Sequence, residues 1–440
     1  VPLQMVSQTW DDHDRSGRYT CRDFGQNYLN SVQTDGKPII FTNGDNDTFP
    51  LWYNQETEGF RTDVRVCNLS YLQTDWYIDQ MRRPAYDSPS VPIDWERIDY
   101  VQGHNEAVYV RPDAMETINN YYKQYPEEAK KEFGDNPYEL KNILKYWVRS
   151  PKEGLQMIPT DSIVIKLDKE AIKRSGMLTP DSIPDYMHIS LKGKRVLYKS
   201  ELMMLEMLAN TNWERPMYMA ITVGQENHLN LTNNFLQEGL AYRITPFDNA
   251  KLGRRIDSEK MYDNLMHKFK FGGIDNPDIY LDETVLRMCD THRRMFVQLA
   301  SQLIKEGKND KALEVLDYCE KVIPSTTVHH DYIYSSSKEM ADDYAKLGET
   351  GKAENILCQL AQNSVEYAAW YMSLDDIRLA SSYEECIRHY TILDDVCKAL
   401  EKLKDENGKP LESATSYRHQ FDQLYGLLEN RIGKANPAHE

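Results

Sequence analysis

Residues 39–50 read Ile-Ile-Phe-Thr-Asn-Gly-Asp-Asn-Asp-Thr-Phe-Pro, and this stretch decides the predicted fold of the first half of the chain. Four apolar or β-prone residues precede six polar ones, which predicts a buried strand followed by a tight loop. Asp47 or Thr48 is suited to cap a helix that has Pro50 in its first turn, where a missing N–H costs little. A second apolar run at residues 64–69 follows at about the spacing of one helix and a turn. Together these segments outline a βαβ unit.

Strand and helix patterns continue beyond this unit. A helix pattern at residues 199–210 precedes an apolar strand pattern at residues 217–223, which again fits a crossover unit. Residues 187–191 and 195–198 flank a Lys-Gly turn and predict a hairpin. We therefore predict an α/β domain at residues 1–256, with a Rossmann-like and mostly parallel sheet.

Two helices and an insertion complete this domain. Residues 70–81 predict a helix with Trp76 among the residues of its buried side. The pattern loosens from about residue 82 to residue 159, where prolines break it and tyrosines are frequent. We predict an inserted, mixed segment there. Residues 19–32 predict an amphipathic helix whose apolar face contains Phe24, Tyr28, Leu29 and Val32.

Residues 257–440 have an almost entirely helical pattern. Gly307 and Gly348 are each followed, five residues later, by an alanine, and apolar helices flank both segments. A glycine at the turn and an alanine opening the second helix are typical of tetratricopeptide repeats. We therefore predict a tetratricopeptide-like repeat domain, in which helices at about 382–403 and 413–431 supply a third pair or a cap.

Composition excludes several classes of partner. The 440 residues carry a formal net charge of −17, with a pI near 5.2 and a mean hydropathy of −0.67. Such an acidic surface repels nucleic-acid phosphates and anionic lipid. No run of about 18 apolar residues is present, so we expect no membrane insertion by this chain. The chain starts at Val1 without a signal peptide, so we expect it to be part of a longer protein.

The first candidate binding site is the polar loop after the first strand, with Asn43, Asp45, Asn46, Asp47 and Thr48. Ligands bind beyond the carboxyl ends of strands in open α/β sheets. Carboxylate and amide oxygens are suited to a hard cation and equally to sugar hydroxyls. The alternative is that these residues only satisfy the N–H groups of the helix start. We predict no bound metal or other cofactor, and Asp45 and Asp47 are the ligands that a divalent cation would use.

The second candidate site is a cluster near the start of the chain, which contains Asp11, Asp12, His13, Asp14 and Arg15. Three acids and a histidine are suited to a metal site or an acid–base centre. The alternative is a solvated, internally paired segment. If this cluster meets the first loop, the density of carboxylates will raise the pKa of at least one of them.

Residues 10–18, 41–53 and 64–70 carry a resemblance to a known family. They resemble the C-terminal region of large multi-spanning membrane proteins of Gram-negative gut bacteria, a family of unknown function. Its membrane part is similar to protein O-mannosyltransferases of the C-type glycosyltransferase superfamily. The resemblance covers at least residues 5–80. It implies a periplasmic domain attached, at the inner membrane, to an enzyme that uses a lipid-linked sugar.

The resemblance assigns no catalytic residue to this chain, because the catalytic acid is expected near the first membrane helices. It implies a module that binds acceptor protein, glycan, peptide or the parent membrane domain rather than catalysing alone. Two alternatives stay open. One is a free-standing, metal-assisted hydrolase that uses Asp45, Asp47, Asp11 and His13. The other is a scaffold that holds a peptide in the groove of its helical repeats.

Overall fold

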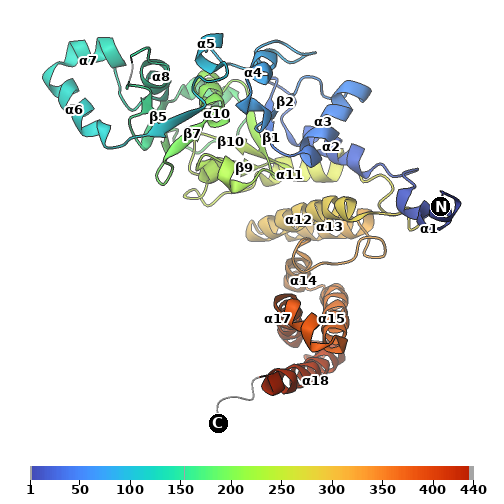
Figure 1. Ribbon diagram of the computed structural model, residues 1–440. Coiled ribbons are helices and arrows are strands. Elements are labelled where there is room, and N and C mark those ends of the chain that lie inside the picture. Colours follow the sequence, from blue (N-terminus) through green and yellow to red (C-terminus); the bar gives the residue numbers. More distant parts are fainter. Residues whose placement is uncertain (1, 153, 436–440) are drawn as a thin grey trace. The chain divides into compact units, whose positions relative to one another are not determined.

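Two compact units divide the chain, and each is described by itself. The computed structural model describes residues 2–152 and 154–435, and Figure 1 shows the order of the elements. The α/β unit contains residues 21–270. The helical unit contains residues 1–20 and 271–440. The α/β unit is therefore inserted, in sequence, into the helical unit.

The predicted βαβ unit is confirmed. Its parallel strands β1 (Ile39–Thr42) and β2 (Arg65–Asn68) flank helix α3 (Asp45–Glu58). All residues of both strands are buried, as expected for strands covered on both faces. The helix begins at Asp45, before the predicted cap at Asp47 or Thr48, so Pro50 lies inside it. Pro50 has no N–H to donate to the Asn46 carbonyl, which leaves that carbonyl without its usual partner within the helix.

The main sheet has the strand order β2-β1-β8-β10-β9 among the described residues. β8 (Met217–Ala220) pairs parallel with β1, whereas β10 (Ala241–Ile244) is antiparallel to β8 and to β9 (Phe235–Gln237). The prediction of a mostly parallel sheet is therefore wrong for half of the strand pairs. For β9 and β10 the reason is the short connection at residues 238–240, because a connection of this length joins only antiparallel strands.

The predicted hairpin at residues 187–198 is also wrong. β6 (Tyr186–Ser190) pairs with β5 (Ser162–Lys166), and β7 (Val196–Tyr198) pairs with β3 (Ala107–Val110). Ile189 lies opposite Ile163 on the buried face of the first pair. The match of apolar faces between distant strands thus outweighs the local turn signal.

The remaining elements of the α/β unit surround these strands. β4 (Met157–Ile158) pairs with β3. The helices of the unit are α2 (Thr20–Ser31), α4 (Asp75–Met81), α5 (Arg97–Tyr100), α6 (Ala114–Gln124), α7 (Pro126–Phe133), α8 (Leu140–Asn142), α9 (Lys169–Arg174), α10 (Lys199–Asn210) and α11 (Ser258–Asp263). Short 3-10 or π turns are η1 (Tyr71–Gln73), η2 (Ile143–Val148), η3 (Gln225–Asn227), η4 (Leu231–Asn234) and η5 (Asn264–Lys268).

Helix α2 agrees with its predicted amphipathic face, whose residues Phe24, Tyr28, Leu29 and Val32 are all buried. The side chain of Asn27, on the same helix, also joins the two ends of the α/β unit. Asn27 Nδ2 donates to the Lys270 carbonyl at 2.8 Å, and the Lys270 N–H donates back to Asn27 Oδ1 at 2.8 Å. The beginning and the end of this unit are therefore adjacent.

A charged group lies inside the core of the α/β unit. Glu238, which is 1% exposed, accepts from the Tyr218 hydroxyl at 2.8 Å and from Lys260 Nζ at 2.9 Å. Its Oε1 lies 3.7 Å from Nη1 of the fully buried Arg243. Because ions are costly to bury, Glu238 and Arg243 depend on each other for charge compensation.

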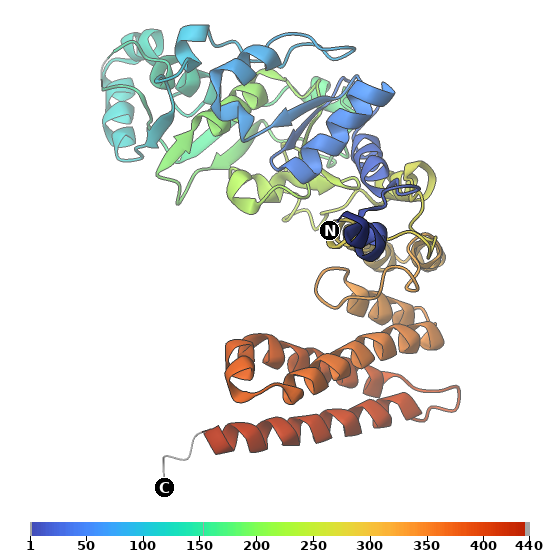
Figure 2. The same ribbon diagram turned by 45° about the vertical axis from the view of Figure 1, so that its right-hand side comes forward.

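The helical unit consists of successive helices, and Figure 2 shows α18, in red, lying along the preceding helices. The elements are α1 (Pro2–His13), α12 (Glu283–Lys305), α13 (Asn309–Val322), α14 (Ser337–Lys346), α15 (Thr350–Ser373), α16 (Asp376–Ser381), α17 (Tyr383–Lys402) and α18 (Glu412–Ala435). Gly307 and Gly348 adopt positive φ angles of 75° and 86° between paired helices, as the repeat pattern predicts. Ala312 and Ala353 are fully buried. The tetratricopeptide-like classification itself stays a prediction.

No helix in the described part of the chain is both long and apolar enough to cross a membrane.

Replacing Glu238 tests the buried charge group. We expect Glu238→Ala to lower the free energy of unfolding by about 3–5 kcal/mol, because Arg243 is left buried without its counter-charge. Urea unfolding followed by circular dichroism measures this effect. The control is Lys260→Met, which removes a half-buried partner of Glu238 and should cost about 1 kcal/mol. Equal unfolding midpoints for Glu238→Ala and the unmodified chain would contradict the prediction.

Candidate binding site at the carboxyl ends of the strands

The carboxyl ends of β1, β2 and β8 meet at one edge of the main sheet, because these strands are parallel. Asn68 ends β2, and its Nδ2 donates to the Thr48 hydroxyl at 2.9 Å and to the Asn43 carbonyl at 3.1 Å. The Thr48 hydroxyl donates to Thr42 Oγ1 at 2.8 Å. The loop at residues 43–48 is thus fixed between two strand ends. β1 pairs with β2 on one side and with β8 on the other. Ligands of α/β sheets bind beyond the carboxyl ends of strands, at points where neighbouring connections lead in opposite directions.

Asp47 attaches this loop to β8 and α2. The Thr222 hydroxyl donates to Asp47 Oδ2 at 2.8 Å and in turn accepts from the Tyr28 hydroxyl at 3.0 Å. The Asn43 N–H lies 3.4 Å from the same carboxylate oxygen. Asp47 is only 3% exposed, and burial raises the pKa of Tyr28 well above its usual range. The Asp47 carboxylate therefore serves the structure of the loop.

The solvent-facing part of the loop has a different composition. Gly44, Asp45 and Asn46 are exposed, and Asn43 is half-buried. The exposed Ser70 donates from Oγ to Asn43 Oδ1 at 2.8 Å. A ligand approaching this edge would meet one carboxylate, amide groups, a hydroxyl and the Asn46 carbonyl. This set accepts and donates hydrogen bonds and holds one negative charge.

A row of aromatic side chains lies beside the loop, on α3 and around η1. We call Phe49, Trp52, Tyr71 and Trp76 the aromatic ridge. Neighbouring ring centroids in this order are 5.8, 6.1 and 5.9 Å apart. Phe49 is 47% exposed and Trp76 is 54% exposed, while Trp52 and Tyr71 are half-buried. Four rings that pack on one another at the surface form a preformed apolar contact area next to polar groups.

The second predicted cluster lies in the helical unit, and the first loop lies in the α/β unit. The side chains of Asp11 and Asp12 are outside the described part of the structure. His13 lies at the end of α1, and its Nδ1 is 2.9 Å from the Thr9 carbonyl. The Asp14 carboxylate accepts from the Ser16 N–H at 2.8 Å, and hydrogen bonds from Ser16 lower the pKa of Asp14.

The basic residues of this segment face the start of α12. Arg18 Nη1 lies 2.8 Å from Asp282 Oδ2, and Arg15 Nη1 lies 3.8 Å from the same atom. Asp282 also caps α12 by accepting from the Val285 N–H at 3.0 Å. Burial acts to raise the pKa of Asp282, but these donors hold it below its ordinary value. The two arginines of this segment thus pair with a carboxylate that lies outside it.

Around the strand-end loop, the described residues form no metal-binding cluster. Among the described residues, no group of three or more histidine, cysteine, aspartate or glutamate side chains is placed to hold a metal ion. Asp45 faces solvent, whereas Asp47 Oδ2 accepts hydrogen bonds from the Thr222 hydroxyl and the Asn43 N–H. The two carboxylates that the sequence offers to a divalent cation therefore differ in environment.

Several residues at this edge were missed by the sequence prediction. Asn68 and Ser70 follow the second strand, and their position at a parallel strand end was a usable signal. Thr222 follows β8 and had no local signal, because the pairing of β8 with β1 spans most of the unit. Trp76, predicted on a buried face, is exposed, because α4 begins at Asp75 and buries Tyr77, Ile78 and Met81 instead.

Comparison with known proteins assigns the chain to a family. No curated protein and no solved structure matches it significantly. The model of one family, described as TMEM260-associated domain 2, matches residues 21–261, which is more than half of the chain and nearly all of the α/β unit. This family is linked to the membrane protein TMEM260. The chain therefore belongs to the TMEM260-associated domain 2 family.

Proposed function

We propose that this chain is the soluble periplasmic module of a membrane-embedded glycosyltransferase that uses a lipid-linked sugar. In this proposal the membrane part performs the transfer, and the module binds the acceptor protein or its glycan at the carboxyl ends of β1, β2 and β8. Membership of a family linked to a membrane protein supports the first part. The chemistry of the strand-end site supports the second.

The observation that carries the proposal is the division of roles within the loop. Asp47, the buried carboxylate, accepts hydrogen bonds from Thr222 and the Asn43 N–H. A general acid or base must reach the proton that it transfers, and this carboxylate is occupied by the fold. The groups open to a ligand are amides, a hydroxyl, the Asp45 carboxylate and the aromatic ridge. Apolar rings with a few polar groups are typical of binding sites that fix a ligand without reacting with it.

A glycan fits this combination better than an extended apolar peptide. Sugar rings present hydroxyl groups that pair with amide and carboxylate oxygens, and C–H faces that pack on aromatic rings. Asn43, Asp45 and Ser70 supply the first kind of contact, and Phe49 at the end of the ridge supplies the second. The metal-assisted hydrolase remains the alternative, and it requires carboxylates that converge on an ion.

Binding of a glycan is the first test. The probes are oligosaccharides that end in mannose, glucose, galactose or N-acetylglucosamine, and the measurement is saturation-transfer NMR followed by calorimetry with the full chain. We expect at least one probe to bind, and Phe49→Ala to weaken it about 3- to 10-fold, because one ring contact is worth ~0.5–1.5 kcal/mol.

The matched control is Tyr53→Ala, which removes another exposed aromatic side chain of α3 that is not part of the ridge. We expect unchanged binding in this variant and weaker binding in Asp45→Ala. Binding that tolerates both Phe49→Ala and Asp45→Ala would place the glycan elsewhere. Failure of every probe and of acceptor polypeptides to bind would remove the proposed role of the site.

The division of labour with a membrane part gives a second test. We expect the isolated chain to transfer no sugar from a lipid-linked donor to an acceptor polypeptide, because in this proposal the membrane part performs the transfer. Mass spectrometry of the acceptor after incubation measures this. The positive control is the same assay with membranes that contain the full-length parent protein. Detection of sugar transfer by the isolated chain refutes the division of labour.

A further inference from the structure

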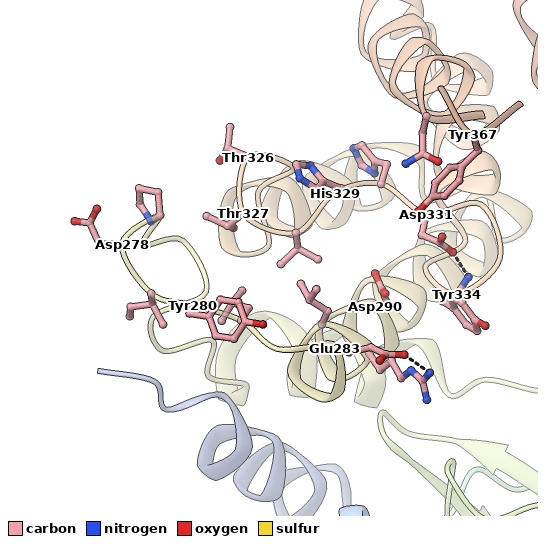
Figure 3. Close-up of a pocket in the computed structure, with 18 residues that line it drawn as sticks. Asp278, Tyr280, Glu283, Asp290, Thr326, Thr327, His329, Asp331, Tyr334 and Tyr367 are labelled. Carbon is pink, nitrogen blue, oxygen red and sulfur yellow. Dashed lines mark hydrogen bonds and ion pairs between the residues drawn. The ribbon is translucent and has the colours of Figure 1, made fainter. Parts of the chain in front are cut away.

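The helical unit contains a cavity of about 830 Å³. Figure 3 shows its three walls: the segment that precedes α12, the first turns of α12, and the loop between α13 and α14. Asn363 and Tyr367 of α15 close one side. All of these residues belong to the helical unit. The volume lies within the range of ligand-binding pockets, so the cavity has room for a side chain with part of its backbone.

Arg293 of α12 fixes the loop wall of this cavity. Its fully buried guanidinium donates to the carbonyls of Ile323 at 3.0 Å, Val328 at 2.6 Å and His329 at 3.1 Å. Three carbonyls from one loop thus converge on one side chain. The loop is therefore held in place by hydrogen bonds from one buried cation to three backbone carbonyls.

Asp290 lies one turn earlier on α12 and lines the cavity. It is 9% exposed, and its Oδ1 accepts no hydrogen bond from any residue in the described part of the chain. The nearest cation is Arg293, whose Nη1 lies 3.6 Å from this oxygen, beyond hydrogen-bond distance. A buried carboxylate without a hydrogen-bond donor is unfavourable, so a cationic group that lies in the cavity beside Asp290 gains affinity from its charge.

The charges around Asp290 also favour a positive ligand. Asp278, Glu283 and Asp331 line the same cavity. Asp331 accepts the backbone N–H of Ile333 at 2.7 Å, and it therefore orders the loop while keeping its charge near the site. The one lysine or arginine among the lining residues that the structure describes is Arg287, which lies 2.5 Å from Glu283. The balance of charge in the cavity is negative.

We propose that this cavity binds the arginine or lysine side chain of a polypeptide, with Asp290 as the counter-charge. The partially exposed rings of Tyr280, Tyr334 and Tyr367 stand at its rim, where they can pack on the stem or the cationic group of such a side chain. The site is separate from the strand-end site and does not depend on the proposed glycan binding.

A basic side chain fits the cavity better than a metal ion does. Among the described residues, no group of three metal-ligating side chains is arranged around an ion. One buried carboxylate and aromatic walls match the donors and the flat faces of a guanidinium, and charge-assisted hydrogen bonds of this kind are strong. The cavity is also far larger than a single ion requires.

The test compares two peptides that differ only in charge. The probe is a labelled heptapeptide, Gly-Ser-Gly-Arg-Gly-Ser-Gly, and its partner has citrulline in place of arginine, which keeps the shape and removes the charge. Binding to the full chain is measured by fluorescence anisotropy. We expect the arginine peptide to bind at least about 10-fold more tightly than the citrulline peptide, and Asp290→Asn to remove this difference.

The control for charge is Asp422→Asn, an equal change at an exposed position of α18 outside the cavity, which should leave binding unchanged. Thr326→Lys serves as a second variant in case Asp290→Asn alters the fold. Thr326 is exposed on the cavity wall, and a lysine there adds a positive charge to the lining that repels a cationic guest. We expect this variant to bind the arginine peptide at least about 10-fold more weakly.

Acidification provides an independent readout. Burial and, to a smaller extent, the nearby Asp331 raise the pKa of Asp290 to about 6, against the lowering effects of Arg293 and Arg294. Binding of the arginine peptide should therefore weaken about 10-fold between pH 7.5 and pH 5, as Asp290 becomes protonated. The decrease should be smaller in Asp290→Asn, where the two histidines that line the cavity, His329 and His330, can still respond to acid.

Three results would overturn the proposal. They are equal affinity for the arginine and citrulline peptides, unchanged affinity in Asp290→Asn, and absence of binding to the unmodified chain at about 1 mM peptide. None of these results bears on glycan binding by the α/β unit, because the probes contain no sugar. Loss of glycan binding in Phe49→Ala would likewise leave this test intact.

Discussion

The hydrogen bond from the Thr222 hydroxyl to the buried Asp47 carboxylate determines the form of the strand-end site. It joins the first turn of α3 to Thr222, which lies two residues after β8. The Tyr28 hydroxyl extends this connection to α2. Three elements that are distant in sequence are thus fixed by one side chain. Because hydrogen bonds to a charged group are strong, the exposed loop residues keep a defined position without a ligand.

This arrangement explains why acidic sequence motifs are poor guides to catalysis. Asp45 and Asp47 are two residues apart, yet one faces solvent and the other is buried and hydrogen-bonded. The acidic cluster near the start of the chain shows the same tendency, since Asp14 accepts a local N–H and Arg18 pairs with Asp282. By contrast Asp290, which has no acidic motif around it, has a buried carboxylate oxygen that accepts no hydrogen bond from the described residues. Environment decides the role of a carboxylate more than its neighbours in sequence do.

Local patterns predicted the βαβ unit and the helix pairs well. The run at residues 39–50 combines a buried strand, a polar loop and a helix start, and the glycines at 307 and 348 mark turns that only need local geometry. The sheet order was beyond such patterns. β6 and β7 pair with distant strands because their apolar faces match. Thr222 lies at the site because β8 pairs with β1, with Ile39 opposite Met217. The ridge was missed because a tryptophan in an apolar pattern normally predicts burial.

The tie between Asn27 and Lys270 has a consequence for how the chain is assembled. It places the entry and exit of the α/β unit side by side, as expected of a module that is inserted into another without disturbing it. During synthesis, Arg18 emerges before the α/β unit, but its partner Asp282 emerges only after that unit. The α/β unit is complete before α12 has been made. The α/β unit can therefore fold first. Because its first and last residues are adjacent, folding brings the two segments of the helical unit close together and lowers the entropic cost of joining them.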